Sequence, residues 1–274
     1  MTIGRVFTLT VLAMLAFAGN SILCRLALKT TQIDAASFTA IRIVSGAIAL
    51  WAIARLRGSV VGGSWWSALS LLAYAALFSF AYLHLSAATG ALLLFAAVQA
   101  TMVGAGLWRG ERMSAIQCLG FVVALTGLVG LLLPGLSAPS PLGAVLMAGA
   151  GVAWGAYSLR GRGAADPLGE TAGNFIRGAP LSLLLLPFSP LAPPPADGMI
   201  YAVLSGALTS GCGYAIWYAA LRGLSTTGAA TVQLSVPVIV AAAGVLLLGE
   251  PLSLRMLLAA AAILGGIALV LRRR

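Results

Sequence analysis

Long apolar stretches separated by short polar breaks dominate the pattern along this chain. A helix needs roughly 20 apolar residues to cross the hydrocarbon core of a bilayer. The pattern predicts ten such helices, over residues 6–27, 35–54, 65–85, 89–108, 115–133, 141–160, 170–187, 198–221, 227–248 and 254–271. The breaks contain helix-ending sequences such as Pro134-Gly135, Asp166-Pro167 and Pro193-Pro194-Pro195. Pro180 and Pro237 lie within predicted helices and are expected to bend them. The expected fold class is an all-α membrane protein with ten transmembrane helices.

The composition agrees with lipid as the solvent of this chain. Of its 274 residues, 61% are hydrophobic and only 8% are charged, whereas a soluble domain carries about 25% charged residues. The net charge of +10 is spread in ones and twos between apolar stretches. A nucleic-acid-binding protein gathers such charges on one face, so we expect no nucleic acid partner. Cys24, Cys118 and Cys212 are too far apart for a disulfide framework or a zinc site and are interpreted as packing residues.

The N-terminal segment resembles a secretory signal, because Arg5 and an apolar stretch precede the small residues Ala16 and Ala18. The apolar stretch continues to Leu28, however, and the segment has a counterpart in the second half of the chain. We therefore interpret it as the first transmembrane helix.

Lysine and arginine residues predict the orientation. With the N-terminus in the cytoplasm, the outer breaks hold Arg25, Lys29 and Arg255. The cytoplasmic breaks then hold Arg5, Arg55, Arg57, Arg109, Arg112, Arg160, Arg162, Arg222, Arg272, Arg273 and Arg274. Cytoplasmic segments carry the excess of positive charge in membrane proteins. We therefore expect a multi-pass protein of the bacterial inner membrane with both termini in the cytoplasm.

The two halves of the chain share a series of short motifs. Residues 1–134 and 135–274 are the two predicted repeats, each with five helices. The motif pairs are Ile41-Arg42 with Ile176-Arg177, Thr89-Gly90-Ala91 with Thr227-Gly228-Ala229, and Gly110-Glu111 with Gly249-Glu250. Because five is odd, the second repeat enters the membrane from the opposite side. Inverted repeats of this kind are typical of secondary transporters, whose substrate site lies near the bilayer midplane between the repeats.

In their order and spacing, these motifs resemble the EamA-type drug/metabolite transporter superfamily over nearly the whole chain. The resemblance is carried by the five-plus-five arrangement, the arginine in the second helix of each half, the Thr-Gly-Ala motif and the Gly-Glu motif that follows it. It implies a metabolite carrier, in bacteria frequently an exporter of amino acids, and the aromatic amino-acid exporters are the subgroup we expect. One departure is Ala18-Gly19-Asn20, where members often carry Trp-Gly-Asn; the sixth helix keeps Trp154-Gly155.

Polar side chains within a membrane are costly and are candidates for function. Gln99, Gln233 and Asn20 lie inside predicted helices and are candidate substrate ligands. The alternative is a hydrogen bond between helices, worth about 0.6 kcal/mol in a membrane. The carboxylates all fall near breaks, which argues against a carboxylate proton relay. They are Asp34, Glu111, Asp166, Glu170, Asp197 and Glu250.

Aromatic residues at helical spacing form a second group of candidate substrate ligands. The members are Phe78 with Tyr82, Tyr214 with Tyr218, and Trp154 with Tyr157. Aromatic walls with a few polar groups suit an amphipathic or aromatic substrate. The alternatives are core packing or a belt at the membrane interface, the latter also expected for Trp65, Trp66, Trp108 and Trp217.

His84 and two arginines complete the candidates. His84 is the one histidine of the chain and could couple transport to protons by titrating near neutral pH, or it could be an interfacial polar group. Arg42 and Arg177 could attract a substrate carboxylate, or their long side chains could bind backbone carbonyls at the membrane edge.

The sequence thus predicts a secondary transporter that works by alternating access on amino acids or similar small metabolites. The alternatives are a channel or an integral membrane protein without transport activity. An enzyme is not expected, because the one histidine has no evident serine partner in the sequence and no cluster of His, Asp or Glu lies at membrane depth. No cofactor is expected. ATP-driven pumping is not expected, because the sequence contains no phosphate-binding Gly-rich loop. The oligomeric state stays open.

Overall fold

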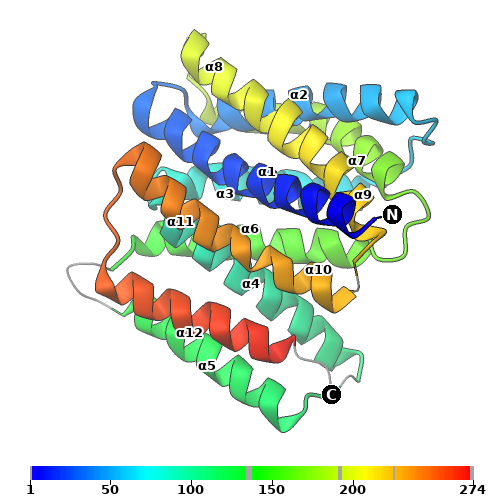
Figure 1. Ribbon diagram of the computed structural model, residues 1–274. Coiled ribbons are helices and arrows are strands. Elements are labelled where there is room, and N and C mark those ends of the chain that lie inside the picture. Colours follow the sequence, from blue (N-terminus) through cyan, green and yellow to red (C-terminus); the bar gives the residue numbers. More distant parts are fainter. Residues whose placement is uncertain (1, 111, 134–137, 191–192, 225, 272–274) are drawn as a thin grey trace.

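Figure 1 shows the computed structural model as a bundle of helices. The structure describes residues 2–110, 112–133, 138–190, 193–224 and 226–271, and these contain no β-strand. Glu111, Pro134-Gly135 and Arg272–Arg274 lie outside the described residues. By length and composition, seven helices of the described part could cross a membrane, if Ala196–Leu221 is counted as one.

Helices cover each of the ten predicted segments. The first half contains α1 (Ile3–Thr30), α2 (Ala35–Leu56), α3 (Trp65–Tyr82), α4 (Ala87–Trp108) and α5 (Ala115–Leu132). The second half contains α6 (Pro141–Arg160), α7 (Pro167–Leu181) with the 3₁₀ segment η1 (Ser182–Phe188), α8 (Ala196–Val203), the π-helical segment η2 (Leu204–Cys212), α9 (Gly213–Leu221), α10 (Thr226–Gln233), α11 (Ser235–Leu248) and α12 (Leu254–Val270).

Side-chain caps explain why most of these helices begin where they do. The side-chain oxygen of the N-cap residue accepts a hydrogen bond from a backbone N–H in the first turn, which would otherwise lack a partner. Ser114 and Gln117 form a reciprocal capping box at the start of α5. Other capping residues are Asp34, Ser64, Ser86, Ser140, Asp166 and Ser253.

The predicted ninth helix is divided into α10 and α11. Pro237 has no N–H to bond to the carbonyl of Gln233, and the helix is interrupted between Gln233 and Ser235. The predicted eighth helix runs through α8, η2 and α9 without a break, and its middle segment η2 has π-helical geometry. Single π-turns inside α-helices often mark functional sites.

The packing of the two halves is similar. In several cases where two helices pack against each other, their counterparts in the other half also pack against each other. α3 packs against α6, and α9 packs against α1; α4 packs against α6, and α11 packs against α1. α2, α4 and α5 each pack against their own counterparts α7, α11 and α12. Gly120 of α5 lies against Gly266 of α12, whereas Gly127 lies against Ala262. The α5–α12 pair is therefore antiparallel, as Figure 1 also shows.

Candidate functional site

A cavity of about 730 Å³ lies between helices of the two halves. Its wall extends to the exposed residues Arg112, Gly161 and Arg162, so the cavity opens at the end of the bundle where α1 begins and α12 ends (Figure 1). This volume lies within the usual range for sites that bind small molecules. The cavity is therefore large enough to hold a metabolite.

The opposite end of the bundle is closed by a largely buried ion pair between Arg25 and Glu250. Glu250 accepts hydrogen bonds from Arg25 Nε at 2.8 Å and from the backbone N–H of Ala87 at 2.7 Å. Arg25 also donates to the carbonyl of Tyr82 at 2.7 Å, and Lys29 donates to the carbonyl of Leu248 at 2.7 Å. These contacts connect α1 to the start of α4 and to the loop before α12. Glu250, at their centre, is buried.

The Thr-Gly-Ala motif of the first half contributes to this closure. A Cβ atom at Gly90 would overlap the ring of Tyr82, so only glycine lets that ring lie against α4. Tyr82 is fully buried, and its hydroxyl donates to the carbonyl of Ala87 at 3.3 Å. The predicted substrate ligand Tyr82 thus lies at the closed end, outside the wall of the cavity.

One wall of the cavity is aromatic, with Trp154 at its centre. The Trp154 ring lies 4.8 Å from Tyr74, 5.3 Å from Tyr157 and 5.6 Å from Tyr214, measured between centroids. Tyr218 extends the group, with its ring 6.2 Å from that of Tyr214. Offset and tilted contacts at these distances are the favoured arrangements of aromatic pairs. The wall therefore presents ring faces and edges to whatever enters.

Hydroxyl groups at the edge of this wall are hydrogen-bonded to α7. Tyr157 donates to the hydroxyl of Thr171 at 3.3 Å and accepts from Asn174 at 3.4 Å. The Thr171 hydroxyl also lies 2.7 Å from that of Tyr218. These bonds fix the orientation of both tyrosine rings.

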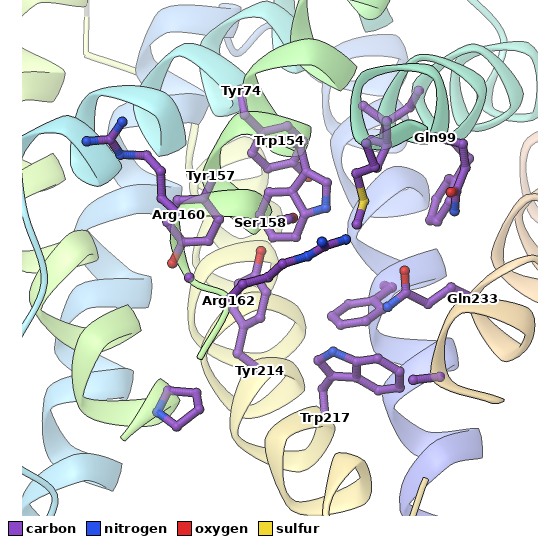
Figure 2. Close-up of a pocket in the computed structure, with 18 of the residues that line it drawn as sticks. Tyr74, Gln99, Trp154, Tyr157, Ser158, Arg160, Arg162, Tyr214, Trp217 and Gln233 are labelled. Atoms are coloured by element: carbon purple, nitrogen blue, oxygen red, sulfur yellow. The ribbon is translucent and has the colours of Figure 1, made fainter. Parts of the chain in front are cut away.

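Two glutamine amides lie on the other side of the cavity. Figure 2 shows Gln99 and Gln233 across from Trp154, Tyr157 and Tyr214, with Arg162 reaching into the space between the two groups. Neither amide has a hydrogen-bond partner among the residues that the structure describes. Both are therefore free to bind a polar group of a ligand.

The remaining predicted residues fall in different places. Asn20 lies in the wall, donating to the Tyr74 hydroxyl at 3.4 Å and accepting from Ser205 at 2.7 Å. Phe78 also lies in the wall, although its side chain is fully buried. His84 is exposed in the turn after α3, at the closed end and away from the cavity.

The structure adds wall residues that the sequence analysis did not propose as substrate ligands. Tyr74 lies one turn before Phe78, so extending the Phe78–Tyr82 spacing backwards by four residues would have found it. Trp217, expected at the membrane interface, is instead buried against Phe17, with ring centroids 5.8 Å apart. The interfacial interpretation of Trp217 is therefore wrong, while Trp65 and Trp108 are exposed.

Comparisons with known proteins indicate a family for part of the chain and a shared fold. A family model described as the EamA-like transporter family matches residues 141–272. The chain is 57% identical to the uncharacterized protein PA1977 of Pseudomonas aeruginosa, covering 98% of this chain and 96% of that protein. A crystal structure with 21% identity covers 96% of this chain and 97% of its own, with a TM-score of 0.69, and so shares the fold. Residues 141–272 therefore form a domain of the EamA-like transporter family within a multi-pass membrane protein, which supports the transport of small molecules.

Proposed function

We propose that this protein is a secondary transporter that exports amino acids or similar small metabolites across the bacterial inner membrane by alternating access. The observation that carries this proposal is the cavity, which is open at one end and closed at the other by the Arg25–Glu250 ion pair. A site that is open to one side only is one of the two states that an alternating-access mechanism requires. With the orientation expected from the charge distribution, the open end faces the cytoplasm.

Two inverted repeats, residues 1–134 and 135–274, would let the protein adopt the second state. The corresponding helix pairs and the antiparallel arrangement of α5 and α12 support this repeat. The family match to residues 141–272 supports it too, because the match covers nearly all of the second repeat. If α7, α11 and α12 also cross the bilayer, the chain has the ten transmembrane helices of the five-plus-five arrangement.

The substrate would lie between the aromatic wall and the two glutamines. Trp154, Tyr157, Tyr214 and Tyr218, with Phe78 behind them, would contact an apolar or aromatic body. Gln99, Gln233 and Asn20 would bind its polar groups. Tyr82 and His84 would meet the substrate only after the closed end opens. This composition suits an aromatic amino acid, the substrate class that the resemblance to aromatic amino-acid exporters implies.

Counterflow into proteoliposomes tests the proposed function. Vesicles with purified protein are loaded with unlabelled phenylalanine, tryptophan or alanine, and entry of the labelled compound is followed at imposed pH gradients. We expect exchange of at least one aromatic amino acid above the level of protein-free vesicles. No counterflow of any amino acid would contradict the proposal.

Replacing Trp154 with alanine is expected to weaken the binding of aromatic substrates more than that of other substrates. Trp154 contacts three rings of the wall, and such ring contacts are worth about 0.5–1.5 kcal/mol beyond their buried area. The KM for phenylalanine or tryptophan should rise at least about tenfold, and that for alanine should change less. Trp108→Ala is the matched control, because Trp108 is 92% exposed and is not part of the cavity wall. Equal effects of the two variants would contradict the assignment.

A further inference from the structure

A positive charge without an anionic partner is buried at the edge of the cavity. Arg42, on α2, is 2% exposed and lies in the cavity wall. Its Nε and Nη1 atoms have no hydrogen-bond partner among the described residues, and no described carboxylate pairs with it. Burial of an unpaired charge is strongly unfavourable, so buried arginines are almost always paired. The Arg42 guanidinium thus has no neutralising partner among the described residues, and an anionic ligand in the cavity could supply one.

The counterpart of Arg42 in the second half shows what a purely structural arginine looks like in this fold. Arg177, on α7, donates hydrogen bonds to the carbonyls of Gly62 and Gly173 and thereby fixes the loop before α3 to α7. Arg42 has no such carbonyl contact in the described residues. The two equivalent arginines therefore have different environments, and only Arg42 keeps hydrogen-bonding capacity beside the cavity.

Tyr74 connects Arg42 to the cavity. Arg42 Nη2 donates to the Tyr74 hydroxyl at 3.3 Å, and its guanidinium carbon lies 5.3 Å from the centre of the Tyr74 ring. Asn20 donates to the same hydroxyl at 3.4 Å. The oxygen thus accepts two hydrogen bonds, while its own proton has no acceptor among the described residues. Because a nearby cation strengthens the hydroxyl as a donor, an anion in the cavity would be bound there.

Most of the other ionisable side chains in the wall are also cationic. Its ionisable side chains are Arg42, Arg112, Arg160, Arg162 and Glu170, in addition to the tyrosines. Glu170 already accepts a hydrogen bond from the backbone N–H of Gly63 at 3.0 Å. A cleft in which one sign of charge predominates raises the local concentration of ligands of the opposite sign. The arginines near the open end would therefore draw an anion inward.

We propose that Tyr74, with Arg42 behind it, forms an anion-binding subsite, so that the substrates of this transporter carry a carboxylate or another organic anion. The Tyr74 hydroxyl would donate to the anion and Arg42 would supply the neutralising charge, while the body of the substrate lies against Trp154. This inference rests on the proposed function and narrows it, because neutral and cationic metabolites of the same shape become poor substrates.

Binding of isosteric ligands to the unmodified protein is the first part of the test. Thermal stabilisation in non-ionic detergent is titrated with 3-phenylpropionate, 3-phenylpropanamide, 3-phenylpropylamine and 2-phenylethylphosphonate. We expect the two anions to bind at least about tenfold more tightly than the amide or the amine, because hydrogen bonds to charged groups exceed neutral ones in strength. Comparison of the carboxylate with the phosphonate identifies which anion the subsite prefers. Equal binding of acid and amide, or no binding of either anion, would overturn the proposal.

Three variants form the second part. Tyr74→Phe and Arg42→Gln should bring the ratio of anion to amide affinity close to one, whereas Arg177→Gln should leave it unchanged. If Arg42→Gln does not fold, Tyr74→Phe decides, because it removes a single hydroxyl and keeps the ring against Trp154. An undiminished anion preference in Tyr74→Phe would overturn the subsite.

This test is independent of the transport assay. Charge-selective binding without amino-acid counterflow would support the proposed anion-binding subsite and contradict the proposed export of amino acids. Amino-acid counterflow with equal binding of acid and amide would keep the transporter and contradict the subsite.

Discussion

Replacing Glu250 with glutamine is expected to release the closed end of the cavity and reduce the population of the present conformation about 100-fold relative to an open one. Removing one partner of a buried ion pair costs about 3–5 kcal/mol, and every 1.4 kcal/mol corresponds to a factor of ten. We use the lower end of this range because Arg25 is partly exposed and keeps its bond to the Tyr82 carbonyl. The cost applies only to conformations in which the pair is formed.

Hydrogen–deuterium exchange measures this release directly. The backbone N–H of Ala87 donates to Glu250, so its exchange reports on the contact itself. In Glu250→Gln, peptides over residues 83–90 and 248–256 should exchange faster, while peptides over 158–166 at the open end should not change. Glu170→Gln is the matched control, since Glu170 is exposed at the open end. Unchanged protection of the 83–90 peptide in Glu250→Gln would show that the ion pair does not hold this end closed.

Replacing Gly206 with valine is expected to have the largest effect on stability. Gly206, in η2, lies against the backbone of α2, and a Cβ atom there would overlap the Arg42 carbonyl and the Ser45 hydroxyl. Backbone atoms cannot move aside as a flexible side chain can, and overpacking of this kind costs about 1–3 kcal/mol or more. The two helices would separate next to Arg42, and the aromatic wall would move with them.

Thermal unfolding of the purified variants in detergent measures this cost. We expect Gly206→Val to lower the Tm by about 5 °C or more, or to prevent folding. Gly104→Ala, on α4, is the control, because a Cβ atom at Gly104 meets nothing within 4 Å and alanine favours the helix. If both variants unfold at the temperature of the unmodified protein, α2 and η2 are not packed as closely as described.

Most of the helix positions could be predicted from the sequence because burial in lipid leaves a strong signal. The length of each apolar stretch indicated the position of a helix, and cap residues such as Ser86 and Ser140 lie where the helices begin. The π-helical geometry of η2, which packs against α2, could not be predicted, because no local motif in the sequence indicates it. Pro237 indicated a bend but not that α10 would end at Gln233.

The candidate site was predicted less completely, because an apolar helix shows little of which face it turns toward a neighbour. Spacing alone grouped Phe78 with Tyr82, yet Phe78 borders the cavity and Tyr82 closes the opposite end. Trp217 has the sequence context of an interfacial tryptophan and is nevertheless buried. Arginine also has two different environments at Arg42 and Arg177. The Arg177 guanidinium donates to two backbone carbonyls, whereas Nε and Nη1 of Arg42 have no hydrogen-bond partner among the described residues.

The central claim is that the two halves lie in opposite orientations across the membrane and enclose the cavity between them. Cysteine labelling in intact and permeabilised cells tests it most directly, with Arg112→Cys and Leu252→Cys introduced separately after Cys24, Cys118 and Cys212 are replaced. Both positions are exposed and follow the Gly-Glu motif of their half. The inverted arrangement predicts that an impermeant maleimide labels Leu252→Cys in intact cells and Arg112→Cys only after permeabilisation. Labelling of both positions under the same condition would place the motifs on one side and contradict the inverted transporter.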